Sequence, residues 1–287
     1  MKRILLCTDG SIFSHSSYEY AAWVARPSGA MVEVLYVTDA RKKAAVEARN
    51  FSGSLPAGAS QALLNQLVAL EQEKAKLDHE QAKLILQDAE RILTGNAIED
   101  VKLIHETGYL LDYLHRLEVD ADLIILGKRG ETSQFAAGHL GSNVERIIRA
   151  SSQPCLVTSA KFTSPERLLL AYDGSPSCQK MLQFLIDLPV FKALVLHIVT
   201  VAKHSEEETA IACRDEARKK AKIGGLEPIC RVIEGHPEVA ISQYAKDNTI
   251  DLLMMGAYGH NRIRHLVIGS TTTQILQHID LPVLLFR

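Results

Sequence analysis

A glycine-rich stretch near the end of the chain has the composition of a phosphate-binding loop. Gly256 directly follows a short apolar run, residues 252–255, of the kind that forms a buried strand. Gly259 and Gly269 come next, and hydroxyl residues occupy positions 270–272, where a helix is predicted to begin. Glycines allow the backbone to approach a ligand closely, and the free N–H groups of a helix start attract an anion. The alternative is an ordinary surface loop with a Ser/Thr helix cap.

Nine residues separate Gly259 from Gly269, and their charges favour the phosphate interpretation. The segment holds two histidines and two arginines, among them His260 and Arg262, and it contains no acidic residue. Cations beside backbone N–H groups and a helix dipole stabilise a bound phosphate further. The order of strand, glycine loop and helix start therefore predicts an anion site at the carboxyl end of a strand.

Length and composition place the chain among ordinary globular proteins of about two domains. It has 287 residues, 47% of them hydrophobic and 23% charged, with a net charge of −2. This charge balance argues against general binding to nucleic acids or membrane surfaces. No apolar run approaches the roughly 18 residues that a membrane span needs. Five scattered cysteines without CxxC spacing predict a reducing cytoplasm and buried, inert thiols.

The chain reads as two copies of one pattern of alternating strands and helices. Residues 3–11 and 167–175 are both apolar strands that end in Asp-Gly-Ser, with Asp9 and Asp173 at matching positions. Second strands are expected at 32–38 and 193–200. The pattern predicts two tandem domains, 1–160 and 161–287, each a five-stranded parallel sheet with helices on both faces. Ligands in such sheets bind at the carboxyl ends of the strands.

The first copy carries an insertion over about residues 50–95. Residues 60–94 are strongly helical in composition, and Leu63, Leu70, Leu77 and Leu84 recur every seven residues. The partner heptad positions are polar or charged (Lys74, Gln81 and Asp88), which argues against a true coiled coil. We expect this helix to cover its own sheet, and an arm that binds a partner is the alternative.

These residues resemble the universal stress protein family. The resemblance rests on the spacing Gly-x2-Gly-x9-Gly-Ser, on the upstream Asp and on the strand order, and it covers essentially the whole chain as a tandem pair. It implies Rossmann-like domains of the adenine nucleotide alpha hydrolase type that bind ATP or AMP, with or without Mg²⁺, and act in a stress response. It also implies pairing of the last strands, here 155–159 and 283–287 of one chain. A further homodimer stays open.

The resemblance assigns roles to residues of the second copy. Asp173 would face the adenosine, and Ile198 would touch adenine through its backbone. The glycines and hydroxyls would hold ribose and phosphates. The full nucleotide-binding set predicted for the second copy is Ala171, Tyr172, Asp173, Ile198, Gly256, Gly259, His260, Arg262, Gly269, Ser270, Thr271 and Thr272.

The first copy departs from the family pattern. Ten residues, not nine, separate the second and third glycines of its loop, and Glu131 enters that segment. One extra residue is expected to shift the amides that face a phosphate, although Lys128 and Arg129 would partly offset the added carboxylate. The first copy is therefore expected to be a degenerate site, formed by Asp9, Val37, Gly127, Gly130, Gly141 and Ser142.

Three classes of function remain open. The favoured one is a nucleotide-binding sensor or regulator of the stress response. An interaction scaffold, or a binder of another phosphorylated ligand such as a nucleotide-sugar, is the alternative. The sequence predicts no catalytic residue and no metal site, and it lacks the Gly-x4-Gly-Lys-Ser/Thr motif of P-loop enzymes. Slow ATP hydrolysis stays open.

Overall fold

A computed structural model describes residues 1–39, 57–130, 140–257 and 269–287, with side chains at 57–64 and at Ser142 left outside this description. All the strands of these ranges form one ten-stranded sheet in the order β3-β2-β1-β4-β5-β10-β9-β6-β7-β8. The strands are β1 Arg3–Thr8, β2 Met31–Asp39, β3 Val101–Gly108, β4 Leu123–Gly127, β5 Cys155–Thr158, β6 Arg167–Ala171, β7 Val195–Ala202, β8 Ile229–Glu234, β9 Leu252–Gly256 and β10 Val283–Phe286.

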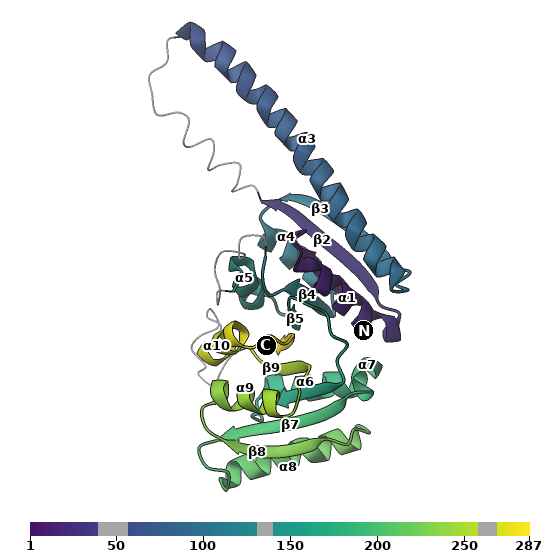
Figure 1. The fold of residues 1–287 in the computed structure, drawn as a ribbon, viewed down its shortest axis with the longest axis vertical. Helices are drawn as coiled ribbons and strands as arrows, with labels where there is room; N and C mark the ends of the chain where they lie inside the picture. Colours follow the sequence, from purple (N-terminus) through teal and green to yellow (C-terminus); the bar gives the residue numbers. More distant parts are fainter. Residues whose placement is uncertain (40–56, 131–139, 258–268) are drawn as a thin grey trace.

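Helices cover both faces of this sheet (Figure 1). One face packs against α1, α3, α6, α7 and α8, and the other packs against α4, α5, α9 and α10. The described helices are α1 Ser14–Ala25, α3 Ala57–Gly95, α4 Leu110–Leu117, α5 Ser142–Ala150, α6 Pro176–Asp187, α7 Pro189–Lys192, α8 Glu208–Ile223, α9 Pro237–Asp247 and α10 Ser270–His278. Within the described ranges, no helix combines the length and apolar character that a membrane crossing requires.

The apolar strands are buried on both faces, as their near-continuous hydrophobic runs predict. In β1, Ile4 and Leu6 enter the core on one side, whereas Leu5 and Cys7 enter the core on the other. Successive side chains of a strand point to opposite faces, so such a run needs helices on both sides. The predicted α/β class with two tandem parallel units is therefore confirmed.

The two halves meet at a single antiparallel pair of strands. Every other neighbouring pair in the sheet is parallel, but β5 and β10 run in opposite directions, with Leu284 opposite Leu156. All residues of both strands are buried. The expected pairing of the last strands is thus present within one chain.

One predicted strand is displaced along the chain. The sequence pattern placed the second strand of the second half at 193–200, but β7 spans Val195–Ala202. The short helix α7 lies just before this strand. The Leu194 N–H then donates a hydrogen bond to the Phe191 carbonyl of that helix. The apolar residues of this short helix extend the hydrophobic run upstream, which made the strand seem to begin two residues early.

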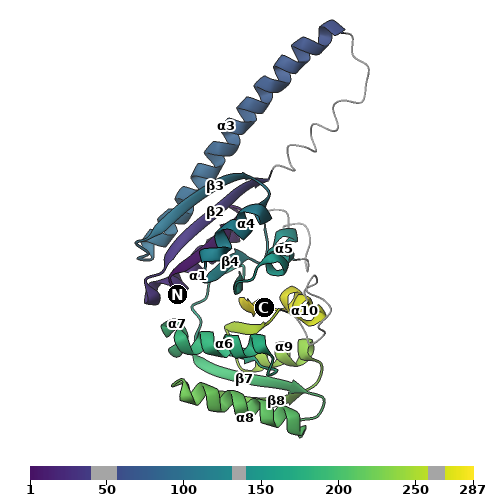
Figure 2. The same cartoon turned by 180° about the vertical axis from the view of Figure 1, so that it is seen from behind.

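The insertion is dominated by one long helix, α3, of 39 residues. Its carboxyl-terminal part packs on β2, β3 and α1, and its amino-terminal part extends well beyond the domain (Figures 1 and 2). The predicted helix at 60–94 therefore forms, and it covers its own sheet over part of its length. The helix begins at Ala57, three residues before the predicted start, and the part of the insertion ahead of it lies outside the described ranges.

A buried ion pair fixes the first half of the sheet from within. Glu33 of β2 has a side chain only 1% exposed, and its carboxylate accepts hydrogen bonds from Arg3 Nε at 2.6 Å and Lys102 Nζ at 2.8 Å. Arg3 also contacts Asp120, whose side chain is 70% exposed. The two carboxylates share one guanidinium but differ completely in their access to water.

Replacing Glu33 by alanine is expected to lower the free energy of unfolding by about 3 kcal/mol, because it removes the buried partner of Arg3. Urea denaturation monitored by circular dichroism measures this change. Asp120→Ala is the matched control, and its cost should stay below about 1 kcal/mol because exposed pairs contribute little. Equal costs for the two variants would show that burial of Glu33 is not what matters.

Candidate functional site

The end of β6 presents the first group of predicted residues in the second half. The Tyr172 N–H donates to the Val199 carbonyl at 2.8 Å, and its phenol is buried. Burial raises the pKa of Tyr172 well above its usual value. Asp173 comes next and is exposed, and its Oδ1 accepts a bond from the Ser175 N–H at 2.9 Å. Tyr172 can therefore reach a ligand only through its backbone, whereas the carboxylate of Asp173 faces solvent.

The cap of α6 separates two explanations of Asp173. Ser175 is the N-cap of this helix, since its side chain accepts the Cys178 N–H at 3.3 Å, and Pro176 follows as the first helical residue. Asp173 instead forms a local turn with Ser175. The capping function thus belongs to the serine, and a role for Asp173 as the helix cap is not needed to explain its presence.

The start of α10 is tied to the end of β9. The Gly269 N–H donates to the Ala257 carbonyl at 3.2 Å, which closes the glycine loop. Thr272 is buried, and its hydroxyl donates to the Gly256 carbonyl at 3.2 Å. Ser270 is exposed and Thr271 is half-buried. Thr272 therefore holds the helix in place, whereas Ser270 and Thr271 retain solvent access.

The remaining predicted residues of this loop lie outside the described ranges. They are Gly259, His260 and Arg262. The structure does bring the flanking groups to one edge of the sheet, because β6 and β9 are parallel neighbours. Asp173, Gly256 and Gly269 all follow or end these two strands at their carboxyl ends.

The sheet register changes the residue expected to face adenine. Leu6 of β1 lies opposite Val34, and the matching Leu170 of β6 lies opposite Ile198. Ile198 is therefore the counterpart of Val34 and is fully buried in mid-strand. Val37 lies three residues after Val34, and Val201 lies three residues after Ile198. Val201, which is partly exposed, is therefore the counterpart of Val37. The sequence pattern pointed to Ile198, and not to Val201, because it aligned the apolar runs and not the strand ends.

The first half holds a well-formed cavity of about 380 Å³. Five of the six residues predicted for its degenerate site line this cavity, namely Asp9, Val37, Gly127, Gly130 and Gly141. The sixth, Ser142, begins α5, and its side chain is outside the description. Asp9 Oδ1 accepts bonds from the Ser11 N–H at 3.0 Å and from Ser14 Oγ at 2.8 Å. The structure thus brings the predicted set together around one space.

The extra residue of the first glycine loop leaves its closure unchanged. The Gly141 N–H donates to the Lys128 carbonyl at 3.4 Å, which is the counterpart of the bond between Gly269 and Ala257. Gly130 lies directly against Asp9, because a Cβ on that glycine would be 2.5 Å from Asp9 Oδ2. Only a glycine leaves room for the carboxylate there. Glu131 is outside the described ranges.

Lys128 does not take the role expected for it in the first cavity. Its ammonium group is buried and donates to the Ile279 carbonyl at the end of α10, in the other half of the chain. Burial lowers its pKa to about 8, although the nearby Asp280 opposes this shift. Arg129, by contrast, lines the cavity. Of the two cations, Arg129 alone lines this space.

The cavity also contains residues that the sequence did not single out as a site. Lys74, Asp78 and Gln81 of α3 form part of its wall, together with Asp39 of β2 and Asn143 of α5. The heptad pattern had identified Lys74 and Gln81 only as polar interruptions. Their position in the cavity depends on how α3 crosses the sheet, and no local pattern carries that information.

Neither thiols nor metal ligands add a second kind of chemistry to this region. All five cysteines are free, and burial raises the pKa values of Cys7, Cys155 and Cys178 to about 12. Such thiols are protonated at neutral pH and unreactive. In the part of the chain that the structure describes, His, Cys, Asp and Glu side chains form no group of three suited to a metal ion.

Comparisons with known proteins agree with this architecture. The model of the universal stress protein family matches residues 1–159 and again residues 165–287. Universal stress protein Slr1230 of Synechocystis is 54% identical over 287 residues, which is the whole of both chains. Because both halves match the family model, the chain belongs to the universal stress protein family as a tandem pair of its domains.

Solved structures extend the similarity of the fold to the whole chain. A universal stress protein from Archaeoglobus fulgidus has a TM-score of 0.70 at 18% identity, with 99% of this chain and 96% of that chain covered. A putative universal stress protein from Pseudomonas aeruginosa has a TM-score of 0.62 at 14% identity, with 100% and 93% covered. At these identities the similarity concerns the fold alone.

The buried ammonium of Lys128 gives a prediction about pH. Its folded pKa of about 8 lies below the ordinary 10.5, so between these values the unfolded chain binds more protons than the folded chain. The free energy of unfolding of the native chain should therefore rise, relative to Lys128→Met, as pH increases from about 8 to 10.5. The gain is at most on the order of 3 kcal/mol.

Denaturant titrations at several pH values measure this difference. Lys161→Met, at an exposed lysine, is the control and should follow the native chain throughout. Parallel pH profiles for the native chain and Lys128→Met would contradict a buried ammonium with a lowered pKa at the junction.

Proposed function

We propose that the second domain binds an adenine nucleotide, ATP or AMP, and that the protein acts as a ligand-responsive regulator of the stress response and not as a committed enzyme. The observation that carries this proposal is the closure of the glycine loop by Gly269 and Ala257. This bond sets the first turn of α10 at the carboxyl edge of β9, next to Asp173 at the end of β6. Backbone N–H groups and exposed hydroxyls suit phosphates there, and a carboxylate suits ribose or adenine donors.

The proposed set of contacts follows from the sequence with two changes. Val201 replaces Ile198 as the residue that offers its backbone to adenine, because it lies at the open end of β7. Thr272 supports the loop and does not contact the ligand. Ala171 and Tyr172, through their backbones, and Asp173, Gly256, Gly259, Gly269, Ser270 and Thr271 remain in the set, with His260 and Arg262 near the phosphates and Mg²⁺ as a companion of ATP.

The same geometry gives no support to a committed catalyst. The sequence offers no residue that can be named as a general base for this site, and it lacks the motif of P-loop enzymes. Membership of the family and the protonated thiols fit a regulator in a reducing cytoplasm. We further infer domain limits of 1–160 and 161–287, with the linker between β5 and β6.

Denaturing the purified protein and identifying any released small molecule by mass spectrometry tests the ligand class. We expect an adenine nucleotide at a stoichiometry of at least one per chain when sites are filled. A nucleotide-sugar would retain the phosphate loop but replace the proposed ligand. No released molecule, followed by no binding of added ATP or AMP, would favour the scaffold instead.

Asp173→Ala is expected to weaken nucleotide binding in the second domain by roughly tenfold or more, equivalent to about 1.4 kcal/mol, because it removes a charged acceptor from the ligand. Isothermal titration calorimetry on ligand-free protein measures this loss. Asp187→Ala, an exposed position at the end of α6, is the matched control and should bind like the native chain. Unchanged affinity in Asp173→Ala would exclude this carboxylate from the site.

A further inference from the structure

Helix α3 consists of an anchored part and an exposed part. Ala82, Leu86, Ala89 and Leu93 are buried, and their spacing of four, three and four residues places them on one face of the helix. From residue 65 to residue 77 every side chain is exposed except that of Leu67, which is half-buried. This exposed part projects beyond the sheet (Figure 1). We call residues 65–77 the arm.

The arm contains apolar residues that the domain does not cover. Val68 is 51% exposed, Leu70 is 62% exposed and Leu77 is 65% exposed. An isolated helix of this length is only marginally stable in water, because the energetic cost of starting a helix is offset mainly by tertiary packing. The order of the arm therefore depends strongly on how firmly its base is held.

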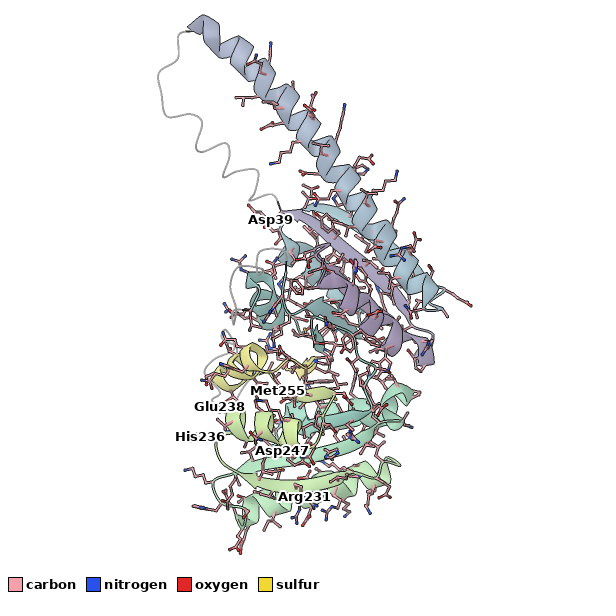
Figure 3. All side chains as sticks on the ribbon, in the orientation of Figure 1. Asp39, Arg231, His236, Glu238, Asp247 and Met255 are labelled. Atoms are coloured by element: carbon pink, nitrogen blue, oxygen red, sulfur yellow. The ribbon has the colours of Figure 1, made fainter. Side chains whose placement is uncertain are left out.

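The first-domain cavity lies at the base of the arm. Lys74, Asp78 and Gln81 line it, and their spacing of four and three residues puts all three on one side of the helix. Asp39, which also lines the cavity, ends β2 at the border of the domain beyond which α3 extends (Figure 3). The cavity thus spans the transition from the anchored part of α3 to the arm.

Two contacts show how closely α3 approaches the body at this level. A Cβ on Gly10 would lie 2.4 Å from Ile85 Cδ1, so the helix packs directly on the turn after β1. His79 packs on His105 of β3 with ring centroids 5.7 Å apart, and His105 Nε2 is 3.0 Å from Thr38 Oγ1. These contacts hold the helix next to the residues that line the cavity, so Lys74, Asp78 and Gln81 lie close to the rest of the domain.

The opposite wall has the groups that a phosphate needs. Arg129 and Asn143 face the cavity with Gly130 and Gly141, and α5 begins at Ser142. Asp9, Asp39 and Asp78 add carboxylates, which accept hydrogen bonds from hydroxyl and amino groups. A volume of about 380 Å³ is within the range of small-molecule sites. A mononucleotide has both an anionic end and donor groups, so it matches this distribution.

We propose that α3 is a ligand-reading helix: a mononucleotide in the first-domain cavity contacts Arg129 and Gly130 on one side and Lys74, Asp78 and Gln81 on the other, and so orders the arm. The proposal takes its ligand class from the proposed function, but it concerns a different site. Contacts to Lys74 extend the anchored part of the helix by about one turn beyond Asp78. Occupancy of the cavity is thereby converted into the order of an exposed apolar helix.

Hydrogen–deuterium exchange on the full chain, with and without saturating AMP or ATP, tests the proposal. We expect exchange of the amides at 65–81 to slow by roughly tenfold with nucleotide, because local opening of the arm becomes rarer. Lys74→Ala and Asp78→Asn should each remove most of this protection and weaken binding to the first domain. Lys76→Ala and Glu80→Gln, exposed positions on the same turns that do not line the cavity, are the matched controls.

Variants that act on one site separate the two proposals. Gly130→Ala should abolish first-domain binding, since its Cβ meets Asp9 Oδ2 at 2.5 Å. It should leave the nucleotide bound near Asp173 in place. Gly95→Ala, where a Cβ meets nothing within 4 Å, controls for the glycine change.

Each outcome then decides a different point. Protection of the arm that survives Asp173→Ala and is lost in Gly130→Ala supports the ligand-reading helix. One nucleotide per chain that is lost in Asp173→Ala, with no change in the arm, overturns this inference and leaves the proposed function intact. Nucleotide in the first domain without protection of the arm also overturns it. Absence of any nucleotide binding overturns both.

Discussion

The antiparallel pairing of β5 with β10 is the constraint on which the arrangement of the whole chain depends. Both strands are entirely buried and mostly apolar, and either one alone would be an exposed hydrophobic edge. Pairing them inside one chain turns two five-stranded sheets into one of ten strands. The outer strands that remain, β3 and β8, carry charged and partly exposed side chains. A further dimer would therefore have to use another surface than the one that joins the two halves.

The same junction also links the two halves near the helices that follow their glycine loops. The helices that follow them, α5 and α10, lie on the same side of the molecule (Figures 1 and 2). Lys128 leaves its own loop and donates to the Ile279 carbonyl at the end of α10. A cation at a helix carboxyl terminus is favourable, and the opposite end of this helix is where we propose that phosphate binds in the second domain. Lys128 therefore connects the end of β4 in the first half to α10, the helix that follows the glycine loop of the second half.

The sequence was sufficient for the number and order of the repeated elements, but not for the register of every strand or for the contacts that α3 makes. Matching Asp-Gly-Ser turns and apolar runs predicted the two units and their class, and the family resemblance implied the pairing of their last strands. The pattern pointed to Ile198, and not to Val201 at the strand end, because a hydrophobic run shows where a strand is but not its register against β6. Lys74, Asp78 and Gln81 could not be found at all, since only the packing of α3 on β2 and β3 brings them to Asp9. The prediction that Gly259 and its basic neighbours bind a phosphate rests on the sequence.

The two domains differ in a way that fits a division of roles. The second domain keeps the family spacing and has Lys203 where the first has Asp39, at matching ends of β7 and β2. The first domain has lost that spacing, yet Gly130 still makes room for Asp9, and its loop closes through the same bond. Its helix between the second and third strands, α3, is also much longer than the counterpart α8, and it supplies a polar wall to the cavity and continues as an exposed arm. A departure from the motif accompanied by a new wall is better explained by an altered site than by a lost one, because a lost site has no need of a glycine against Asp9.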